Sequence, residues 1–146
     1  MAFDPVKIDL KPAEWGADVQ HDLQRIAAHD AAEIEAFRAQ IEAGEMQALA
    51  VYAEGARIGS LVWSVMTDHR GKVCVLNALA ADHVRGVSVA VEIMRRFQLL
   101  ALALGCVSVR AWTRRPGLVK VLENAGAATV WHVLEVSPDG WQQQQQ

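Results

Sequence analysis

The fold is decided by the stretch Lys72–Leu104, which reads KVCVLNALAADHVRGVSVAVEIMRRFQLLALAL. Its first part, Lys72–Ala80, is a short apolar run that predicts a buried strand. Its last part, from about Gly86 to Leu104, is long enough for several helical turns, and Gly105 supplies a stop signal. We therefore expect a strand that passes through a short loop into a long helix.

The predicted long helix is apolar over nearly all of its surface. Its polar residues fall on one narrow stripe, made of Ser88, Glu92, Arg95 and Arg96. A helix of this kind is expected to be buried around most of its circumference. The same charges would be costly in lipid, so we interpret Val84–Leu104 as a buried helix of a soluble protein and not as a membrane span.

Two more strands precede this stretch and form hairpins with their neighbours. Met46–Ala53 and Arg57–Thr67 are joined by the short link Glu54-Gly55. A second turn at residues 68–71 then leads into Lys72–Ala80. Links this short predict that each strand is antiparallel to the next.

Nearer the N-terminus the sequence predicts one strand and two helices. The strand is Phe3–Leu10 and is expected to end before Pro12. Apolar residues then recur at helical spacing from Glu14 to about His29. Asp30 is placed to cap a second helix because a glutamate follows three residues later, as in a capping box.

Three more elements are predicted after the long helix. Cys106–Thr113 alternates between apolar and other residues as a strand does. A helix is expected to start at Pro116, and a last strand is expected at Ala127–Val136. The whole order predicts a single mixed α/β domain over residues 1–136, with a mostly antiparallel sheet of about six strands. Residues 137–146, which end in a run of glutamines, are interpreted as a tail outside the core.

The composition is that of a compact domain. The chain has 146 residues, of which 52% are hydrophobic and 21% charged, which excludes disorder and a disulfide scaffold. Cys74 and Cys106 stand in apolar runs and are expected to be buried, reduced thiols, and no Cys/His spacing indicates a metal site. The N-terminus lacks the features of a signal peptide, so we expect a cytoplasmic location.

The formal net charge is −3, but the two signs are separated along the sequence. Acidic residues predominate in residues 11–45 and basic residues in residues 70–120. A nucleic-acid binder would usually be basic overall, so nucleic acid is not an expected partner. The separation favours either a local site for a phosphorylated small molecule or ordinary solvated faces.

The predicted order of elements resembles the GNAT acyltransferase superfamily over roughly residues 3–136. In that family the segment after the fourth strand carries the pattern Arg/Gln-x-x-Gly-x-Gly/Ala, whose backbone amides hold the pyrophosphate of acetyl-CoA. Amides at a helix N-terminus suit an anion because their N–H groups and the helix dipole face it. The resemblance therefore implies acetyl-CoA as co-substrate and a cradle made of Arg85, Gly86, Val87, Ser88, Val89 and Ala90.

The resemblance also implies where the reacting groups lie. In family members, strands four and five splay apart and the pantetheine of the cofactor pairs with strand four. The matching segment here is Asn77–Ala80. A backbone N–H near Leu79 or Ala80 would then donate to the thioester oxygen.

The catalytic candidates are Asn77 and His83. Asn77 would orient a water or only satisfy a buried amide, and His83 is either a base, since histidine is the residue type suited to titration near neutrality, or an exposed loop histidine. Three tryptophans are candidates for the acceptor pocket, with core packing as the alternative: Trp63, Trp112 and Trp131. Three arginines are candidates for binding the 3′-phosphate of CoA or an acidic acceptor, with solvated charges as the alternative: Arg110, Arg114 and Arg115.

Several positions depart from the family pattern and leave the function open. Ser88 stands where the motif usually has a glycine, Leu122 where a tyrosine often protonates the departing thiolate, and Arg115 where an asparagine is usual. One alternative is an acyl-CoA-dependent N-acyltransferase that acts on a small-molecule or protein amine. The second is a catalytically inactive structural or interaction protein, similar to small GNAT-like proteins of tailed bacteriophages, some of them virion components. The third is an unrelated α+β ligand-binding domain. A homodimer or larger assembly through a sheet edge is compatible with the GNAT fold.

Overall fold

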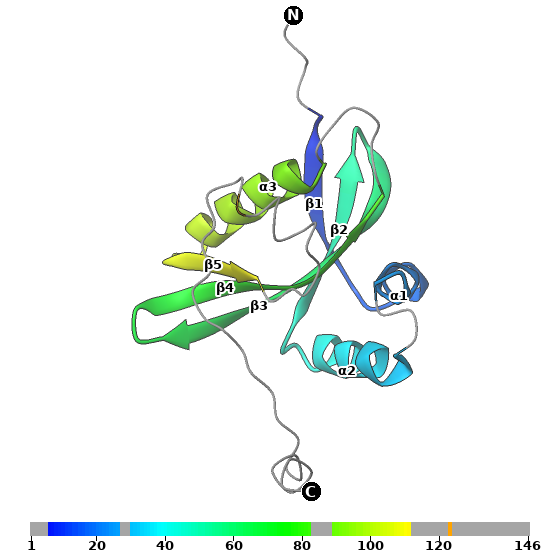
Figure 1. Cartoon of the computed structure of the whole chain (residues 1–146), viewed down its shortest axis with the longest axis horizontal. Helices are drawn as coiled ribbons and strands as arrows, with labels where there is room; N and C mark the ends of the chain where they lie inside the picture. The colour runs from blue at the N-terminus through cyan, green and yellow to red at the C-terminus, as the bar shows by residue number, and fades with distance from the viewer. Residues whose placement is uncertain (1–5, 27–29, 83–88, 112–122, 124–146) are drawn as a thin grey trace, which may run out of the picture.

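A twisted sheet with helices on both faces organises the chain, as the computed structural model in Figure 1 shows. The structure describes residues 6–26, 30–82, 89–111 and 123. The elements follow one another along the chain as β1 (Ile8–Ala13), α1 (Ala17–Gln24), α2 (Ala31–Glu42), β2 (Gln47–Ala53), β3 (Ala56–Asp68), β4 (Gly71–Ala81), α3 (Val89–Ala103) and β5 (Ser108–Ala111).

The sheet is mixed and mostly antiparallel, as the sequence predicts. Its strands lie in the order β1-β2-β3-β4-β5, in which β1 to β4 are antiparallel neighbours and β5 runs parallel to β4. The helix expected from Pro116, the last strand expected at Ala127–Val136 and the tail at 137–146 fall outside the described residues. The described part of the sheet therefore accounts for five of the roughly six expected strands.

The β2–β3 hairpin turns at Glu54-Gly55, as the short link predicts. Both residues have positive φ, +50° at Glu54 and +82° at Gly55, which is the backbone that two-residue hairpin turns need. The backbone N–H of Lys7 donates to Glu54 Oε1 at 2.8 Å, so this carboxylate ties the turn to the start of β1. Glu54 is thus a turn residue with a structural partner.

The prediction that the first strand ends before Pro12 is wrong. β1 runs through Pro12, which lies opposite Leu49 of β2. A proline cannot donate to a sheet ladder, but β1 pairs only with β2 among the described strands and forms an edge there. A proline is tolerated in such an edge strand. The expected start of the strand at residues 3–5 lies outside the described residues.

The first helix is shorter than its apolar pattern predicts. It begins at Ala17, three residues after the expected start at Glu14, because Gly16 is extended with φ −169° and ψ −174°. Glycine is a poor helix former and gives the helix a natural beginning here. The described helix ends at Gln24, and residues 27–29 of the expected range lie outside the description.

The second helix begins as its capping pattern predicts. Asp30 Oδ1 accepts a hydrogen bond from the backbone N–H of Glu33 at 3.0 Å. This bond satisfies one of the N–H groups that every helix start leaves without an intrahelical partner. Ile34 is then buried on the inner side of the helix, and Phe37 and Ile41 pack beside it.

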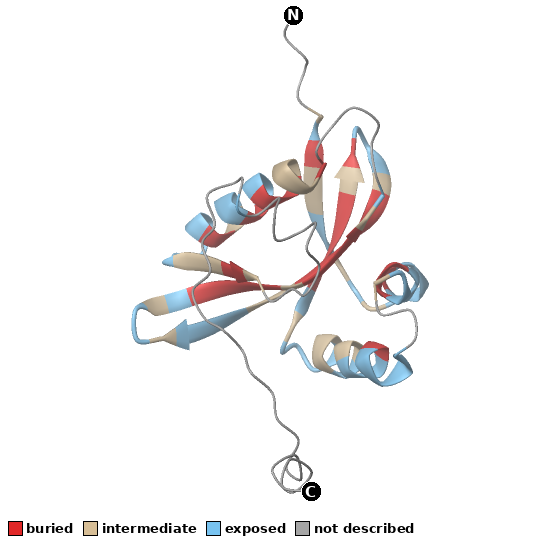
Figure 2. Ribbon diagram, in the orientation of Figure 1, coloured by how far each residue is buried: buried red, intermediate tan, exposed pale blue. Residues whose placement is uncertain are grey.

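The core is divided into two clusters by the sheet, and buried residues follow the middle of the strands in Figure 2. On one face α3 packs against the larger cluster, whose members include Val51, Leu61, Leu76, Ile93 and Phe97. On the other face α1 and α2 pack over a smaller cluster, made of Val19, Leu23, Ile34, Ala48, Val62 and Ala78.

The prediction that the long helix is buried around most of its circumference is wrong for the described residues. α3 buries one stripe: Val89, Ile93, Met94, Phe97 and Ala101. Leu99 and Leu102 on its outer side are 57% and 72% exposed. One stripe suffices because α3 packs against a single face of the sheet. No helix in the described ranges is long and apolar enough to cross a membrane.

Candidate functional site

A β-bulge at Asn77 marks the centre of the candidate site. Val62 of β3 lies opposite Ala78 of β4, but the next residue, Trp63, lies opposite Leu76. Asn77 is therefore the extra residue on β4. A bulge bends its strand and re-aims the neighbouring side chains, and bulges are common next to active sites.

The side chain of Asn77 is oriented by Ser64. Asn77 Nδ2 donates to Ser64 Oγ at 2.9 Å and lies 3.5 Å from the carbonyl oxygen of Val75. Ser64 is two residues from Val62 along β3, so both face the side of the sheet that α1 and α2 cover. The predicted catalytic residue Asn77 is thus half-buried and held in place, and its catalytic role stays a prediction.

The two ends of β4 have different neighbours. Before the bulge, Val73–Leu76 pair with Ser108–Ala111 of β5 in parallel. After the bulge, β4 continues along β3 as far as Ala81 and then leads toward α3. The predicted splaying of β4 from β5 concerns residues beyond 111, which lie outside the described residues. Leu79 and Ala80, the predicted oxyanion donors, are in this second part of β4 and are buried.

Only the end of the predicted pyrophosphate cradle can be placed. Val89 and Ala90 lie in the first described turn of α3. The Val89 side chain is buried in the larger core cluster, so its contribution to a cradle would be its backbone N–H. The remaining predicted residues fall outside the described residues: His83, Arg85, Gly86, Val87 and Ser88. Their roles stay predictions.

A buried ion-pair network next to this segment was not predicted from the sequence. Asp22 of α1 is 4% exposed and accepts from Ser60 Oγ at 2.6 Å, and Arg57 Nη2 lies 2.8 Å from the same carboxylate oxygen. Arg25 Nη1 lies 3.7 Å from Asp22 and 2.9 Å from Asp82 at the end of β4. The network therefore joins α1 to β3 and to Asp82, which precedes the segment that contains the predicted cradle (the predicted cofactor segment).

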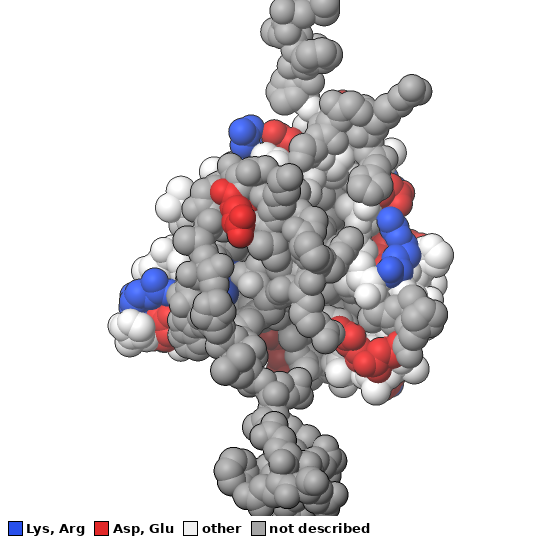
Figure 3. Space-filling view, viewed as in Figure 1, with Lys and Arg blue, Asp and Glu red and all other residues white. Residues whose placement is uncertain are grey.

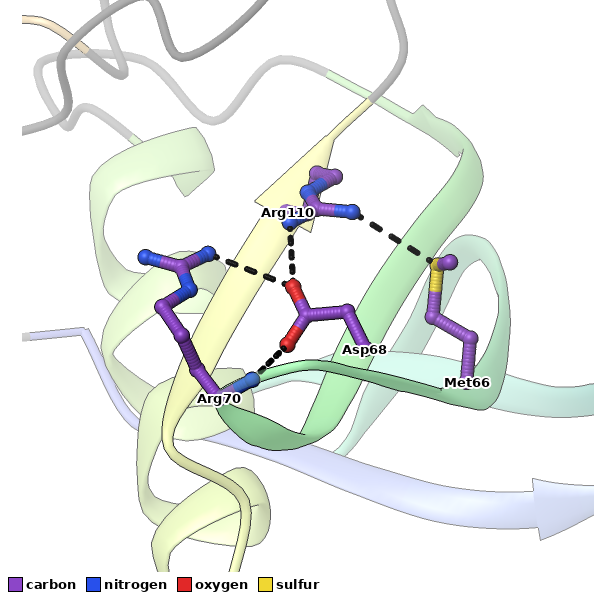
Figure 4. Close-up of polar contacts among 4 residues, drawn as sticks. All are labelled: Met66, Asp68, Arg70 and Arg110. Atoms are coloured by element: carbon purple, nitrogen blue, oxygen red, sulfur yellow. Dashed lines mark hydrogen bonds and ion pairs between the residues drawn. The ribbon is translucent and has the colours of Figure 1, made fainter.

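Arg110 belongs to a second ion-pair cluster, at the tip of the β3–β4 hairpin (Figure 4). Its guanidinium is 8% exposed and donates to Asp68 Oδ2 at 3.1 Å, while Nη1 lies 3.7 Å from Met66 Sδ. The backbone N–H of Arg70 also donates to Asp68 and, with the two guanidinium groups, lowers the pKa of that carboxyl. Neither sequence-based alternative for Arg110 matches this geometry, since it is buried against an acid and holds the hairpin to β5. Arg114 and Arg115 lie outside the described residues.

Among the residues that the structure describes, the separation of charge along the sequence does not persist in the folded chain. Basic patches lie beside acidic side chains on the face drawn in Figure 3. Within residues 70–120, Arg70 and Arg110 pair with Asp68, and Arg95 pairs with Glu92. In the described part of the chain this favours ordinary mixed faces over a phosphate site built from these bases. No group of three metal-binding side chains occurs there either.

Trp63 belongs to the core. Its ring meets that of Phe97 edge-on, with centroids 6.2 Å apart and an interplanar angle of 72°. Its Nε1 is buried and has no acceptor among the described residues. Packing is therefore the better of the two sequence-based interpretations for Trp63. Trp112 and Trp131 lie outside the described residues.

The two cysteines are both free, as expected, but only Cys74 is fully buried. Burial, together with a contact to Cys106, raises the pKa of Cys74 to about 12. A thiol with so little thiolate at neutral pH is a poor nucleophile. Cys74 is therefore a core residue, and Cys106 is half-buried where α3 leads into β5.

Comparison with solved structures identifies the fold. A ribosomal-protein-alanine N-acetyltransferase from Brucella melitensis biovar Abortus 2308 aligns with a TM-score of 0.67 at 16% identity, over 90% of this chain and 99% of that chain. A predicted acetyltransferase from Clostridium acetobutylicum, solved with acetyl-CoA, aligns with a TM-score of 0.68 at 10% identity, over 90% and 96%. The aminoglycoside N-acetyltransferase AAC(6′)-Iy, solved with CoA, aligns with a TM-score of 0.65 at 17% identity, over 94% and 98%.

These matches cover nearly the whole of each relative, and their low identities establish the fold alone. No protein-family model matches the sequence, and no curated protein matches it. The chain therefore has the GNAT acetyltransferase fold that the order of its elements predicts.

Proposed function

We propose that this chain, which has the fold of the GNAT acetyltransferases, binds acetyl-CoA and transfers its acetyl group to an amine. The observation that carries the proposal is the path of β4 through the Asn77 bulge toward α3, within a fold shared with acetyltransferases over nearly their whole length. Two of those relatives were solved with CoA or acetyl-CoA. Bound acetyl-CoA would supply an activated acetyl group.

The residues of this chain would then bind and orient. The backbone of β4 from the bulge onward, Asn77–Ala80, is the segment expected to lie along the pantetheine. The first amides of α3, with the predicted cradle before them, suit a diphosphate because a helix N-terminus favours an anion. Asn77, held by Ser64 at 2.9 Å, would orient the attacking amine or a water near the acetyl group.

The amine would approach from the face of the sheet that α1 and α2 cover. Asn77 and Ser64 lie on this face, beside the small core cluster that includes Val62 and Ala78. An amine must be neutral to attack, so either a base or a low amine pKa is needed. Within the described residues on this face, the buried acid Asp22 is already bound by Ser60 and Arg57. His83 is the base that the sequence offers.

Acetyl-CoA binding without catalysis is the second candidate. Leu122 stands at the position where related enzymes often have a proton-donating tyrosine, and a leucine has no proton to give. Ser88 likewise departs from the glycine of the cradle motif. A chain with these departures would keep the fold and serve a structural or interaction role.

Binding is tested first, with the full chain and acetyl-CoA in a titration calorimeter and in thermal unfolding. Ligand at about 100 times its dissociation constant is expected to stabilise the folded state by about 2.7 kcal/mol. Ser88→Glu would place a carboxylate in the predicted cradle and is expected to abolish the shift. Gln98→Glu adds the same charge on the exposed side of α3 and serves as the matched control. Absence of any binding by the wild type at millimolar acetyl-CoA overturns the proposal.

Catalysis is tested second, by following thiol release with a panel of amines. Release that depends on both the amine and acetyl-CoA supports the transferase. Asn77→Ala is then expected to lower kcat by about tenfold to a hundredfold and to leave the acetyl-CoA dissociation constant unchanged, as loss of a positioning group does. Binding without release by any amine favours the second candidate.

A further inference from the structure

The amide group of Asn77 is held in one orientation by two neighbouring oxygen atoms. Asn77 Nδ2 donates to Ser64 Oγ at 2.9 Å and lies 3.5 Å from the carbonyl oxygen of Val75. A carbonyl oxygen can only accept a hydrogen bond, so the nitrogen of the amide, and not its oxygen, belongs on this side. The Ser64 contact has the normal length of a hydrogen bond, whereas the Val75 contact is at its limit. Ser64 is therefore the main partner that fixes the amide.

The oxygen of the same amide is left available as an acceptor. Among the described residues no group donates to Asn77 Oδ1, and the buried side-chain atom without a partner there is Trp63 Nε1. Asn77 and Ser64 are both half-buried, so a small molecule can reach them. At the bulge, β4 therefore presents a hydrogen-bond acceptor and not a donor.

The register of the sheet makes Ser64 the residue that can hold Asn77. Val75 of β4 lies opposite Ser64 and Ala78 lies opposite Val62, so the bulged Asn77 lies between these two pairs. The residues on either side of Ser64 on the same face of β3 are Val62 and Met66. Neither side chain offers more than a weak acceptor. No neighbour on this face of β3 can therefore replace the Ser64 hydroxyl if it is lost.

We propose that Ser64 is a positioning residue that acts through Asn77, an inference that rests on the proposed function. It keeps Asn77 Oδ1 directed at an N–H of the attacking amine. The amine nitrogen forms the new C–N bond and gains positive charge, while the C–S bond breaks with its electron pair on sulfur, which gains a proton for the one that the nitrogen loses. An acceptor beside the nitrogen stabilises most when that charge has developed. A flipped amide would turn its own N–H groups toward the amine.

The test compares Ser64→Ala and Ser64→Thr in the full chain, by thiol release with an amine that the wild type acetylates. Ser64→Ala is expected to lower kcat about fivefold, the scale of one neutral hydrogen bond. The acetyl-CoA dissociation constant is expected to stay unchanged, and the melting temperature of the unliganded protein to change by less than about 4 °C. Ser64→Thr is expected to keep kcat within about twofold of the wild type, because threonine has the same hydroxyl group.

A double-mutant cycle with Asn77→Ala separates action through Asn77 from an independent role of Ser64. Once residue 77 is alanine, Ser64→Ala is expected to lower kcat no further, because both changes remove the same contact. Thr67→Val is the matched control, since it removes a hydroxyl from an exposed residue on the other face of β3. It is expected to leave kcat unchanged.

The inference is overturned if the wild type transfers acetyl groups and Ser64→Ala keeps its full kcat, or if the losses of Ser64→Ala and Asn77→Ala multiply in full. It is also overturned if the fall in kcat comes with an equal loss of acetyl-CoA affinity, because Ser64 would then support the site as a whole. A wild type that transfers acetyl to no amine overturns the proposed function itself, and the inference falls with it.

Discussion

Gly59 of β3 lies directly against the carbonyl group of Ala80 on β4. A Cβ built at Gly59 would stand 1.9 Å from the Ala80 carbonyl oxygen and 2.6 Å from the Cα of Ala81. Both obstacles are backbone atoms, so no side chain can move aside. The close approach of the two strands beside the predicted cofactor segment therefore requires a residue without a Cβ.

Gly59→Ala is expected to destabilise the fold by about 2–4 kcal/mol, because the two strands must separate to admit the methyl group. The free energy of unfolding in urea measures this change. Gly16→Ala is the matched control, since a Cβ there meets nothing within 4 Å. It is expected to cost less than about 1 kcal/mol. Equal effects of the two substitutions would contradict the close approach.

The buried carboxylate of Asp22 leads to a second prediction. Asp22→Asn keeps the size of the side chain but removes the charge that faces Arg57 at 2.8 Å. The free energy of unfolding is expected to fall by about 2 kcal/mol, the scale of a hydrogen bond to a charged group. The loss stays at this scale because Arg57, which keeps its charge, is partly exposed to water. Asp18→Asn on the exposed side of the same helix is expected to cost less than about 1 kcal/mol. Denaturant titration of both variants checks the difference.

Local chemistry allowed most of the fold to be predicted from the sequence. The Asp30 cap and the Glu54-Gly55 turn depend on residues a few positions apart, and both form as predicted. The path of β1 through Pro12 was missed because an edge position is a property of the whole sheet. The outer face of α3 was misjudged for a similar reason. Leucines such as Leu102 predict burial, but the sheet covers only one side of the helix.

The candidate site was predictable only where a residue type pointed to it. Asn77 was found from its place in the fourth strand, where the resemblance implies that strands four and five splay apart, but the bulge that presents it depends on the register with β3. The Asp22 and Arg110 ion pairs join residues far apart in the sequence, and neither pairing has a local signature. One signal was available for Asp22, which stands on the apolar stripe of its helix next to Leu23.

A third prediction concerns acid denaturation and Asp68. The backbone N–H of Arg70, with Arg110 and the Arg70 side chain, lowers the pKa of Asp68 in the folded state. A lowered pKa stabilises the fold above the unfolded-state value and loses that contribution as the pH falls through the folded-state value. The stability difference between wild type and Asp68→Asn is therefore expected to be constant near neutrality and to shrink below about pH 4.

Denaturant titrations of both proteins between neutral and acidic pH measure this difference. Arg70→Ala is the informative control, because it removes a guanidinium but keeps the backbone N–H, which is the largest cause of the shift. Most of the pH dependence is expected to survive in it. If the free energies of unfolding of the wild type and of Asp68→Asn differ by the same amount at every pH down to acidic pH, the pKa of Asp68 is not lowered by folding.

The fourth prediction is that Cys74 resists thiol reagents in the folded protein. Burial and the contact with Cys106 raise its pKa to about 12, so little of the reactive thiolate forms at pH 8. The side chain is also fully buried, which excludes the reagent. Reaction with an aromatic disulfide reagent, followed by absorbance, is expected to be slow in the native Cys106→Ser variant. Denaturant should make it fast, because unfolding ends the burial that raises the pKa of Cys74 and excludes the reagent. The Cys74→Ser variant reports Cys106 alone in the same assay. Rapid native labelling of Cys106→Ser at its full stoichiometry would show that Cys74 is not in the core of the sheet.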